Sequence, residues 1–387
     1  MGDSPGRSKT AEVAGAGLAG LACATALAQR GWKVRVHERA SDLRMFGAGI
    51  WMWENGLSSL RAIGAEADAI RNARTITAWV VEDQTGREIF RRATTGADRL
   101  LVPTRAAVYQ SLIDAAQRSG VEIQTNSTVI AAEAAGCLVL EDGHRIDADL
   151  IVGADGAHSR VRESLNLTRS LNYLPEGYGR FLVAAEAGDP AEDVVIEQWN
   201  GGRRLLLCPA TSELHYAGFT CPVDDVRGRA IPPDADTWAE SFPSYEWLIR
   251  RFTSEGRWDP GLAIQCRAWS FGHVAIVGDA AHAQAPNLAQ GANITFTNTV
   301  ALAAALDAPL SVPDALRTWE LRERPLTDHV QRWTNGYARA VSEWPDNLAD
   351  YRAPILRALV AFPWVDQQIN RAARHVLPAP AATADRH

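Results

Sequence analysis

The sequence predicts an α/β fold in which β-rich insertions interrupt a Rossmann-like domain. Three observations predict this fold. Near the N-terminus a strand, a glycine-rich turn, an Ala-rich helix and a second strand follow one another within about thirty residues. Far along the chain, a short apolar strand at 274–277 ends in Gly278-Asp279. Between the two, residues 180–267 form short alternating segments separated by turn clusters, a pattern typical of a β-sheet.

The composition excludes several classes of protein. Of the 387 residues, 47% are hydrophobic and 22% charged, which is typical of a water-soluble protein of two or three domains. A formal net charge of −7 does not favour nucleic acid, which requires a basic face. No apolar run reaches the roughly 18 residues of a membrane span, and the N-terminus lacks the apolar core of a signal peptide. We therefore expect a cytoplasmic protein with neither nucleic-acid nor membrane partners.

The five cysteines predict neither a metal site nor a disulfide framework. Their number is odd and no CxxC pair occurs. No Ser–His–Asp set is visible either, so triad and metal chemistry have no candidate residues.

The first strand–helix–strand unit carries the pattern Gly15-Ala-Gly17-Leu-Ala-Gly20. In this context Gly15 permits a tight turn, Gly17 lets a pyrophosphate approach the backbone, and Gly20 lets the helix pack closely on the strand. Glu38 ends the second strand, where a carboxylate can accept hydrogen bonds from ribose hydroxyls. The unit predicts a dinucleotide site and leaves NAD and FAD open.

Two further turns follow buried strands. Gly278-Asp279 places a carboxylate at the carboxyl end of its strand, and Gly291-Ala292-Asn293 opens a helix whose N–H groups would face the same crevice. For a flavin, these N–H groups would meet the pyrimidine edge of the ring. Asp155 follows the strand 150–153 and is either a functional acid or a turn cap.

Three motifs follow one another along the chain: AGAGLAGL with HER, then ADLIVGADGAHSRVR, then VAIVGDAAHAQAPNLAQGAN. In the sequence, order and spacing of these motifs, the chain resembles the single-component FAD-dependent aromatic monooxygenases of the p-hydroxybenzoate hydroxylase fold. The resemblance implies an FAD domain of residues 1–75, 101–175 and 268–377. A β-rich substrate domain would comprise 76–100 and 176–267, before a disordered tail, 378–387.

The resemblance also assigns roles to residues that match the family's motifs. The FAD-contacting set would be Gly15, Gly17, Gly20, Glu38, Arg39, Arg44, Gly49, Arg105, Asp155, Gly278, Asp279, Gly291, Ala292 and Asn293. Within it, Glu38 and Arg39 would hold the adenosine side, and Asp279 the ribityl chain. Pro286 would lie beside the flavin ring, and Asp155 is associated with both FAD and the transient nicotinamide donor.

A narrower resemblance is to the 2-methyl-3-hydroxypyridine-5-carboxylate oxygenases, which hydroxylate and open a pyridine ring. It rests on MFGAGIWMWENGL, GYGRFLV, RRLLLCP and ELHYAGF. It places Arg180, Arg204 and Tyr216 among substrate contacts, with Arg204 and Tyr216 as candidates for activating the substrate. The alternative is that Arg203 and Arg204 form a solvated pair at a sheet edge. Trp51 stands where those enzymes have a tyrosine, which predicts a flat pocket with a different specificity.

The predicted function is an NADH- or NADPH-consuming monooxygenase. The resemblance implies that O2 and a small hydroxylated aromatic or N-heteroaromatic acid react through a flavin C4a-hydroperoxide, with or without ring opening. An FAD oxidase or dehydrogenase and a non-enzymatic FAD-binding protein remain alternatives. A flavin halogenase would need a catalytic lysine, and neither Lys9 nor Lys33 is suitably placed. We expect a monomer or a homodimer.

Overall fold

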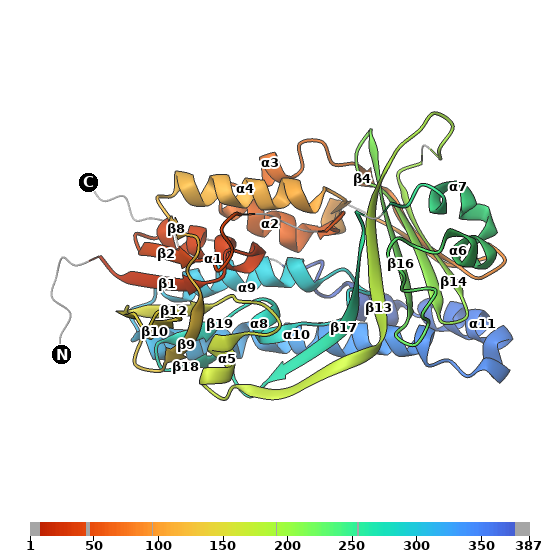
Figure 1. The fold of residues 1–387 in the computed structure, drawn as a ribbon. Coiled ribbons are helices and arrows are strands. Elements are labelled where there is room, and N and C mark those ends of the chain that lie inside the picture. Colours follow the sequence, from red (N-terminus) through yellow and green to blue (C-terminus); the bar gives the residue numbers. More distant parts are fainter. Residues whose placement is uncertain (1–7, 44–46, 95, 191, 254, 376–387) are drawn as a thin grey trace.

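The computed structural model describes residues 8–43, 47–94, 96–190, 192–253 and 255–375. Two β-sheets organise these residues, and Figure 1 shows them side by side with the long helix α10 (Val312–Ser342) extending along both. The smaller of the two sheets carries the glycine-rich turn, and the larger one forms most of the β-rich region.

The first sheet is the predicted Rossmann-like sheet. Its strands from edge to edge are β18 (Ser270–Phe271), β19 (Val274–Ile276), β12 (Leu150–Gly153), β1 (Thr10–Ala14), β2 (Lys33–His37) and β8 (Glu122–Gln124). Neighbouring strands from β19 to β8 pair in parallel, and only β18 is antiparallel. Because the strands are parallel, the turns after β1, β12 and β19 emerge at the same edge of the sheet.

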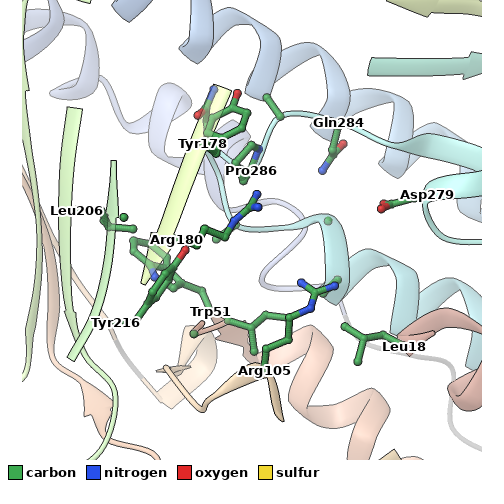
Figure 2. Close-up of a pocket in the computed structure, with 18 of the residues that line it drawn as sticks. Leu18, Trp51, Arg105, Tyr178, Arg180, Leu206, Tyr216, Asp279, Gln284 and Pro286 are labelled. Atoms are coloured by element: carbon green, nitrogen blue, oxygen red, sulfur yellow. The ribbon is translucent and has the colours of Figure 1, made fainter. Parts of the chain in front are cut away.

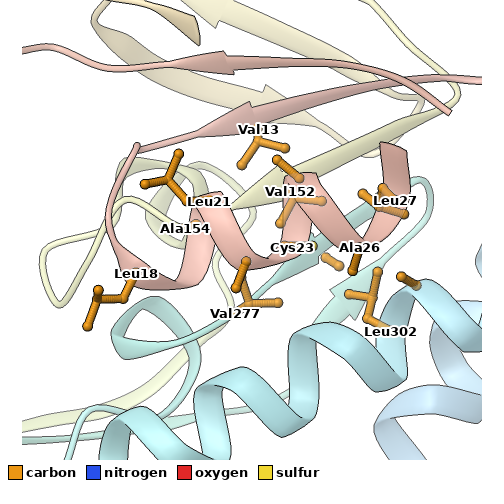
Figure 3. Close-up of a cluster of buried hydrophobic side chains, with 14 of the residues drawn as sticks. Val13, Leu18, Leu21, Cys23, Ala26, Leu27, Val152, Ala154, Val277 and Leu302 are labelled. Atoms are coloured by element: carbon orange, nitrogen blue, oxygen red, sulfur yellow. The ribbon is translucent and has the colours of Figure 1, made fainter. Parts of the chain in front are cut away.

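Helix α1 (Leu18–Ala28) packs between this sheet and the helices α4 (Arg105–Arg118) and α9 (Gly291–Ala305). Its sequence, LAGLACATALA, is apolar on every side, which is typical of a helix buried all round. Figure 3 shows the contacts of Leu21 and Leu27 with the strands, and Leu302 of α9 on the other side. This packing fixes the N-terminal end of α1 beside the strand edge.

The second sheet is mostly antiparallel and has seven strands. In spatial order they are β17 (Arg257–Cys266), β13 (Thr168–Ala184), β16 (Leu214–Pro222), β15 (Arg203–Pro209), β14 (Val194–Asn200), β5 (Ala78–Glu82) and β6 (Glu88–Ala93). Helices α6 (Ala235–Ser241) and α7 (Glu246–Ile249) pack their apolar side chains on one face. The hairpin β5–β6 joins the strands of residues 168–266 in this sheet, and β13 runs across residue 175, where the sequence predicts a domain boundary.

The remaining elements connect or cover the two sheets. Two small sheets contain β9 (Val129–Glu133), β10 (Cys137–Leu140) and β11 (Arg145–Asp147), and β3 (Met52–Trp53), β4 (Thr75–Ile76) and β7 (Leu100–Leu101). The other helices are α2 (Glu54–Ala62), α3 (Glu66–Ala69), α5 (Arg160–Ser164), α8 (Asp279–His282), α11 (Ala349–Val360) and α12 (Pro363–Asn370), with 3-10 turns at 96–98, 243–245 and 346–348.

Three predicted elements differ from the structure. The sequence pattern over 237–252 predicts one helix, but this helix is broken because Pro243 lacks the N–H that a continuing helix needs. The pattern at 181–184 predicts a short strand, whereas the strand begins at Thr168, since it pairs on one side with β17 and on the other with β16. Strand β17 itself was missed because Asp259-Pro260-Gly261 is typical of a turn.

Among the described residues, no helix is long and apolar enough to cross a membrane. Among these described residues, no three His, Cys, Asp or Glu side chains are grouped so that they could hold a metal ion. All five cysteines are buried free thiols.

Candidate active site

A cavity of about 380 Å³ lies between the strand edge of the first sheet and one face of the second. Figure 2 shows side chains from both converging on it, with Asp279 and Leu18 on one side and Leu206 and Tyr216 on the other. We call the end near α1 and α9 the nucleotide end and the end against β13–β16 the sheet end. Twelve of the predicted site residues line the cavity: Gly17, Gly49, Trp51, Arg105, Arg180, Arg204, Tyr216, Gly278, Asp279, Pro286, Gly291 and Ala292.

The glycine-rich turn brings the N-terminus of α1 to the nucleotide end. Gly15 has a φ of +98°, which favours glycine, and a Cβ on Gly20 would lie 1.9 Å from the carbonyl oxygen of Gly15. Gly17 differs from Gly20, because a Cβ there would meet nothing within 4 Å. Gly15 and Gly20 are therefore fixed by local packing, whereas Gly17 keeps the cavity open above the helix.

Glu38 holds the same turn from the end of β2. One carboxylate oxygen accepts from the N–H of Ala16 at 2.9 Å and the other from the N–H of Ala40 at 3.0 Å. Glu38 and the exposed Arg39 do not line the cavity, so any contact with an adenosine would be made outside it. Arg44 lies outside the described residues.

The N-terminus of α9 opens into the cavity opposite α1. Gly291 and Ala292 line it, and no side chain caps this helix. Asn293 points elsewhere: its Oδ1 accepts from the N–H of Trp53 at 3.0 Å and its Nδ2 donates to the carbonyl of Trp51 at 2.9 Å. The side chain of Asn293 therefore fixes the 51–53 segment against α9.

Asp279 projects into the cavity from the turn after β19, with two arginines facing it (Figure 2). Burial within the protein raises the pKa of its carboxyl, while the charges of Arg105 and Arg180 act in the opposite direction. Its backbone neighbour Gly278 has a φ of +62°, and a Cβ there would lie 2.7 Å from the Cβ of Ala19. The geometry leaves the carboxylate beside the N-terminus of α1.

Asp155 acts as the turn cap that was one of its two predicted readings. Its Oδ2 accepts from the N–H groups of Arg160 and Val161 at 2.7 and 3.2 Å. Its Oδ1 is buried and has no hydrogen-bond partner among the described residues. The neighbouring Ala154 and Gly156 line the cavity, whereas Asp155 does not.

Tyr216 lines the cavity from β16, at the sheet end. Its ring packs on Gly49, where a Cβ would lie 2.5 Å from the ring, so only glycine fits there. Burial raises the pKa of the Tyr216 hydroxyl, while the charges of the nearby Arg180 and Arg105 lower it. Arg180 in turn contacts Asp259 at 3.4 Å.

Arg204 is deeply buried, so the interpretation as a solvated edge pair is wrong. Its guanidinium forms ion pairs with Glu176 at 2.9 Å and Glu197 at 3.3 Å. Burial opposes the charged form of Arg204, but the two carboxylates outweigh it and raise its pKa. Arg203 points away to Asp225. Since two carboxylates already balance the charge of Arg204, this geometry does not favour its predicted role in contacting and activating an acidic substrate.

Glu197 is the centre of the sheet end and was missed in the sequence. Its Oε1 accepts from the indole N–H of Trp199 at 2.8 Å, the hydroxyl of Tyr337 at 3.0 Å and Arg204. Glu176 similarly accepts from the hydroxyl of Tyr178 at 2.7 Å. One feature of the sequence could have indicated Glu197, because it is a charged residue within the otherwise apolar or amide-bearing strand 194–199. Its partners are distant in sequence, so no local pattern predicts them.

Trp51 forms a wall of the cavity, and its indole N–H donates to the Sγ of Cys208 at 3.1 Å. The neighbouring Trp53 does not line the cavity, and its ring lies under the guanidinium of Arg92. Sequence reasoning also missed Gln284, which lines the cavity next to Pro286 and whose buried Oε1 has no partner among the described residues.

Two histidines lie outside the cavity lining. His215 contacts Asp189 at 3.0 Å and does not line the cavity, whereas its neighbour Tyr216 on the same strand does. Burial lowers the pKa of His282 to about 4, and its ring lies beside Trp269 and Asn298.

Comparisons with known proteins agree with this geometry. Residues 8–334 match the family model of the FAD binding domain. The chain belongs to this FAD-binding family, within the flavin-dependent aromatic monooxygenases. It is 38% identical over 358 residues to a probable 2-heptyl-3-hydroxy-4(1H)-quinolone synthase of Rhodococcus erythropolis, which covers 90% of this chain and 92% of the relative.

Two further proteins support the family and the fold. The 3-amino-4-hydroxybenzoate 2-monooxygenase of Streptomyces cremeus is 30% identical over 340 residues, covering 83% of this chain and 84% of that one. A solved tetrameric form of 2-methyl-3-hydroxypyridine-5-carboxylic acid oxygenase is 35% identical with a TM-score of 0.85, covering 97% of this chain and all of that one. The protein is thus an FAD-dependent aromatic monooxygenase of the predicted fold.

The residues at the nucleotide end fit FAD. Two helices without side-chain caps, α1 and α9, direct their N-termini into one cavity, which suits an anionic diphosphate and an electron-rich flavin edge. The open spaces at Gly17 and Gly291 let a ligand approach the backbone. Tyr109 supports the turn from α4, since its hydroxyl donates to the carbonyl of Ala16 at 3.0 Å.

Proposed function

We propose that this monooxygenase consumes NADH or NADPH and hydroxylates a small N-heteroaromatic ring bound at the sheet end of the cavity. The observation that carries the proposal is the single cavity that joins the two uncapped helix N-termini to the polar face of the second sheet. Bound FAD, once reduced, would activate O2 for insertion of one oxygen atom into the ring.

The protein's own residues would position the two partners. At the nucleotide end the N-termini of α1 and α9 would hold the diphosphate and the flavin edge, and Asp279 the ribityl hydroxyls. Trp51 and Leu206 would enclose a flat ring and exclude water. Arg180 and Tyr216, which both line the cavity, would stabilise negative charge on a ring oxygen.

Relatives support an N-heteroaromatic substrate. Besides the quinolone synthase named above, a 2-heptyl-3-hydroxy-4(1H)-quinolone synthase of Mycobacteroides abscessus is 37% identical over 356 residues. The structural neighbour acts on a pyridine. A ring with N–H and C=O groups, such as a 4(1H)-quinolone, is therefore the substrate class that we propose.

The test is a cofactor and turnover assay. We expect the purified protein to carry FAD, to oxidise NADH or NADPH slowly alone, and to do so at least tenfold faster with a 4(1H)-quinolone. A protein that binds FAD but does not respond to any heteroaromatic ring would contradict the proposal and favour a non-enzymatic FAD-binding role. Rapid turnover that yields only a dehydrogenated product would favour the oxidase or dehydrogenase.

Assembly and location follow from separate measurements. The sequence predicts a monomer or homodimer, whereas the structural neighbour has a tetrameric form. Light scattering of the purified protein would give the mass of the assembly. A cytoplasmic location accords with the five free thiols and is tested by fractionation of the source cells.

A further inference from the structure

A buried cluster at the sheet end of the cavity places one guanidinium between two carboxylates. Arg204 contributes one positive charge, and Glu176 and Glu197 contribute two carboxylates to the same buried cluster. The guanidinium is therefore already balanced within the protein. A substrate carboxylate placed against Glu197 would face a carboxylate of like charge whose counter-charge, Arg204, is already paired, which is unfavourable.

The two oxygens of Glu197 differ in their surroundings. Oε1 accepts from Arg204, Trp199 and Tyr337, which uses its acceptor capacity. No described residue donates to Oε2, and this oxygen is not fully buried. Because Glu197 lines the cavity, Oε2 is the acceptor that it offers to a ligand.

We propose that Glu197 is a specificity-determining residue that accepts a hydrogen bond from the ring N–H of a neutral heteroaromatic substrate. Arg204, Trp199 and Tyr337 are positioning residues, since they hold the carboxylate through Oε1. A hydrogen bond to the carboxylate would also increase the electron density of the ring, which favours attack by an electrophilic oxygen. This inference rests on the proposed function, and it replaces the acid expected from the sequence with a neutral N–H ring.

The first test compares two probes that differ in one atom. 4(1H)-Quinolone carries an N–H where 4-chromone carries a ring oxygen, and the two have nearly the same shape. We expect the FAD-loaded protein to bind the quinolone at least tenfold more tightly, because hydrogen bonds to charged groups are among the stronger ones. Binding is read from the flavin absorbance spectrum and the tryptophan fluorescence. Equal affinity, or no binding of either probe, would overturn the proposal.

The second test uses Glu197→Gln. The three donors would hold the amide oxygen in the place of Oε1, so that the amide N–H2 would face the cavity. We expect the preference for the quinolone to disappear or to reverse toward the chromone. A purely steric preference would persist in this variant, which has the same size, and its persistence would contradict the proposal.

Glu82→Gln is the matched control. Glu82 lies in the neighbouring strand β5, contacts the hydroxyl of Tyr245 and does not line the cavity. We expect the Glu82→Gln variant to keep the preference for the quinolone. Loss of this preference in the control variant would also contradict the proposal. These measurements need no turnover, so a protein that discriminates the probes without hydroxylating them would refute the proposed function alone.

Discussion

The two ends of the cavity are built in different ways. At the nucleotide end, the glycine-rich turn and Gly278-Asp279 follow β1 and β19, and the helices α1 and α9 present their N-termini to the cavity. At the sheet end, side chains from separate strands and from α10 meet in one buried cluster around Glu197. The first is a backbone site for a cofactor, and the second is a side-chain site that sets which ring can bind.

The largest effect is expected at the sheet end. Arg204→Ala would leave Glu176 and Glu197 buried without their counter-charge, which costs about 3–5 kcal/mol of stability. Urea unfolding of the purified variant measures this loss. Arg203→Ala is the control, because Arg203 is half-buried and its partner Asp225 can reach water. An Arg204→Ala protein as stable as the wild type would show that the cluster is not a charge-paired unit.

The next largest effect is the pH dependence of stability that the buried His282 causes. His282 is neutral when folded because burial lowers its pKa to about 4, whereas the unfolded chain takes up a proton near 6.5. Stability therefore falls as the pH drops from about 6.5 to 4, and this group contributes about 3 kcal/mol to the loss at 1.36 kcal/mol per unit.

His282→Gln should remove that part of the pH dependence. Unfolding free energies at pH 7 and pH 4 for both proteins give the measurement. An unchanged difference between the two pH values would mean that His282 is not held neutral.

A smaller effect is expected for the cofactor. Gly17→Ala should leave the fold intact, because its Cβ meets no protein atom within 4 Å. The methyl group would separate the ligand from the backbone, weakening FAD binding by about tenfold to a hundredfold, the equivalent of one lost charge-assisted hydrogen bond. Titration of the FAD-free protein measures the affinity.

Gly336→Ala is the matched control, since Gly336 lies within α10 and its Cβ would also meet nothing within 4 Å. If both variants bound FAD as tightly as the wild type, the N-terminus of α1 would not be part of the cofactor site.

The smallest effect is at the wall between the two ends. Trp51→Phe loses the hydrogen bond to Cys208 and should cost about 1 kcal/mol of stability or less. We expect a change of a few-fold in the affinity for the quinolone and none in FAD content. Trp53→Phe should change neither the affinity for the quinolone nor the FAD content, because Trp53 does not line the cavity. The reverse result would exchange the roles of the two tryptophans.

The same contrast explains what the sequence could predict. Gly15, Gly17 and Asp279 were identified because each follows its strand directly, so that a local pattern determines both the turn and its position. Glu176 and Arg204 are 28 residues apart, and Glu197 and Tyr337 are 140 apart. Their meeting depends on the register of β13 to β16 and on where α10 packs, neither of which local patterns determine.

Arg204 shows how a correct position can carry a wrong interpretation. Its place in the cavity was predicted, but the charge of a buried arginine depends on its neighbours, and the two glutamates come from other strands. Long-range pairing likewise explains the missed β17, whose Asp-Pro-Gly segment is paired with β13 despite its turn-like composition.

The central claim is that one cavity brings FAD and a neutral N–H heteroaromatic ring together for oxygen insertion. The most direct measurement is the mass of the product formed from a 4(1H)-quinolone by the FAD-loaded protein with NADH or NADPH under isotopically labelled O2. The account predicts a product that gains one labelled oxygen atom, with Glu197→Gln forming at least tenfold less of it at low quinolone concentration. An unlabelled product, or hydrogen peroxide without any modified ring, would contradict it.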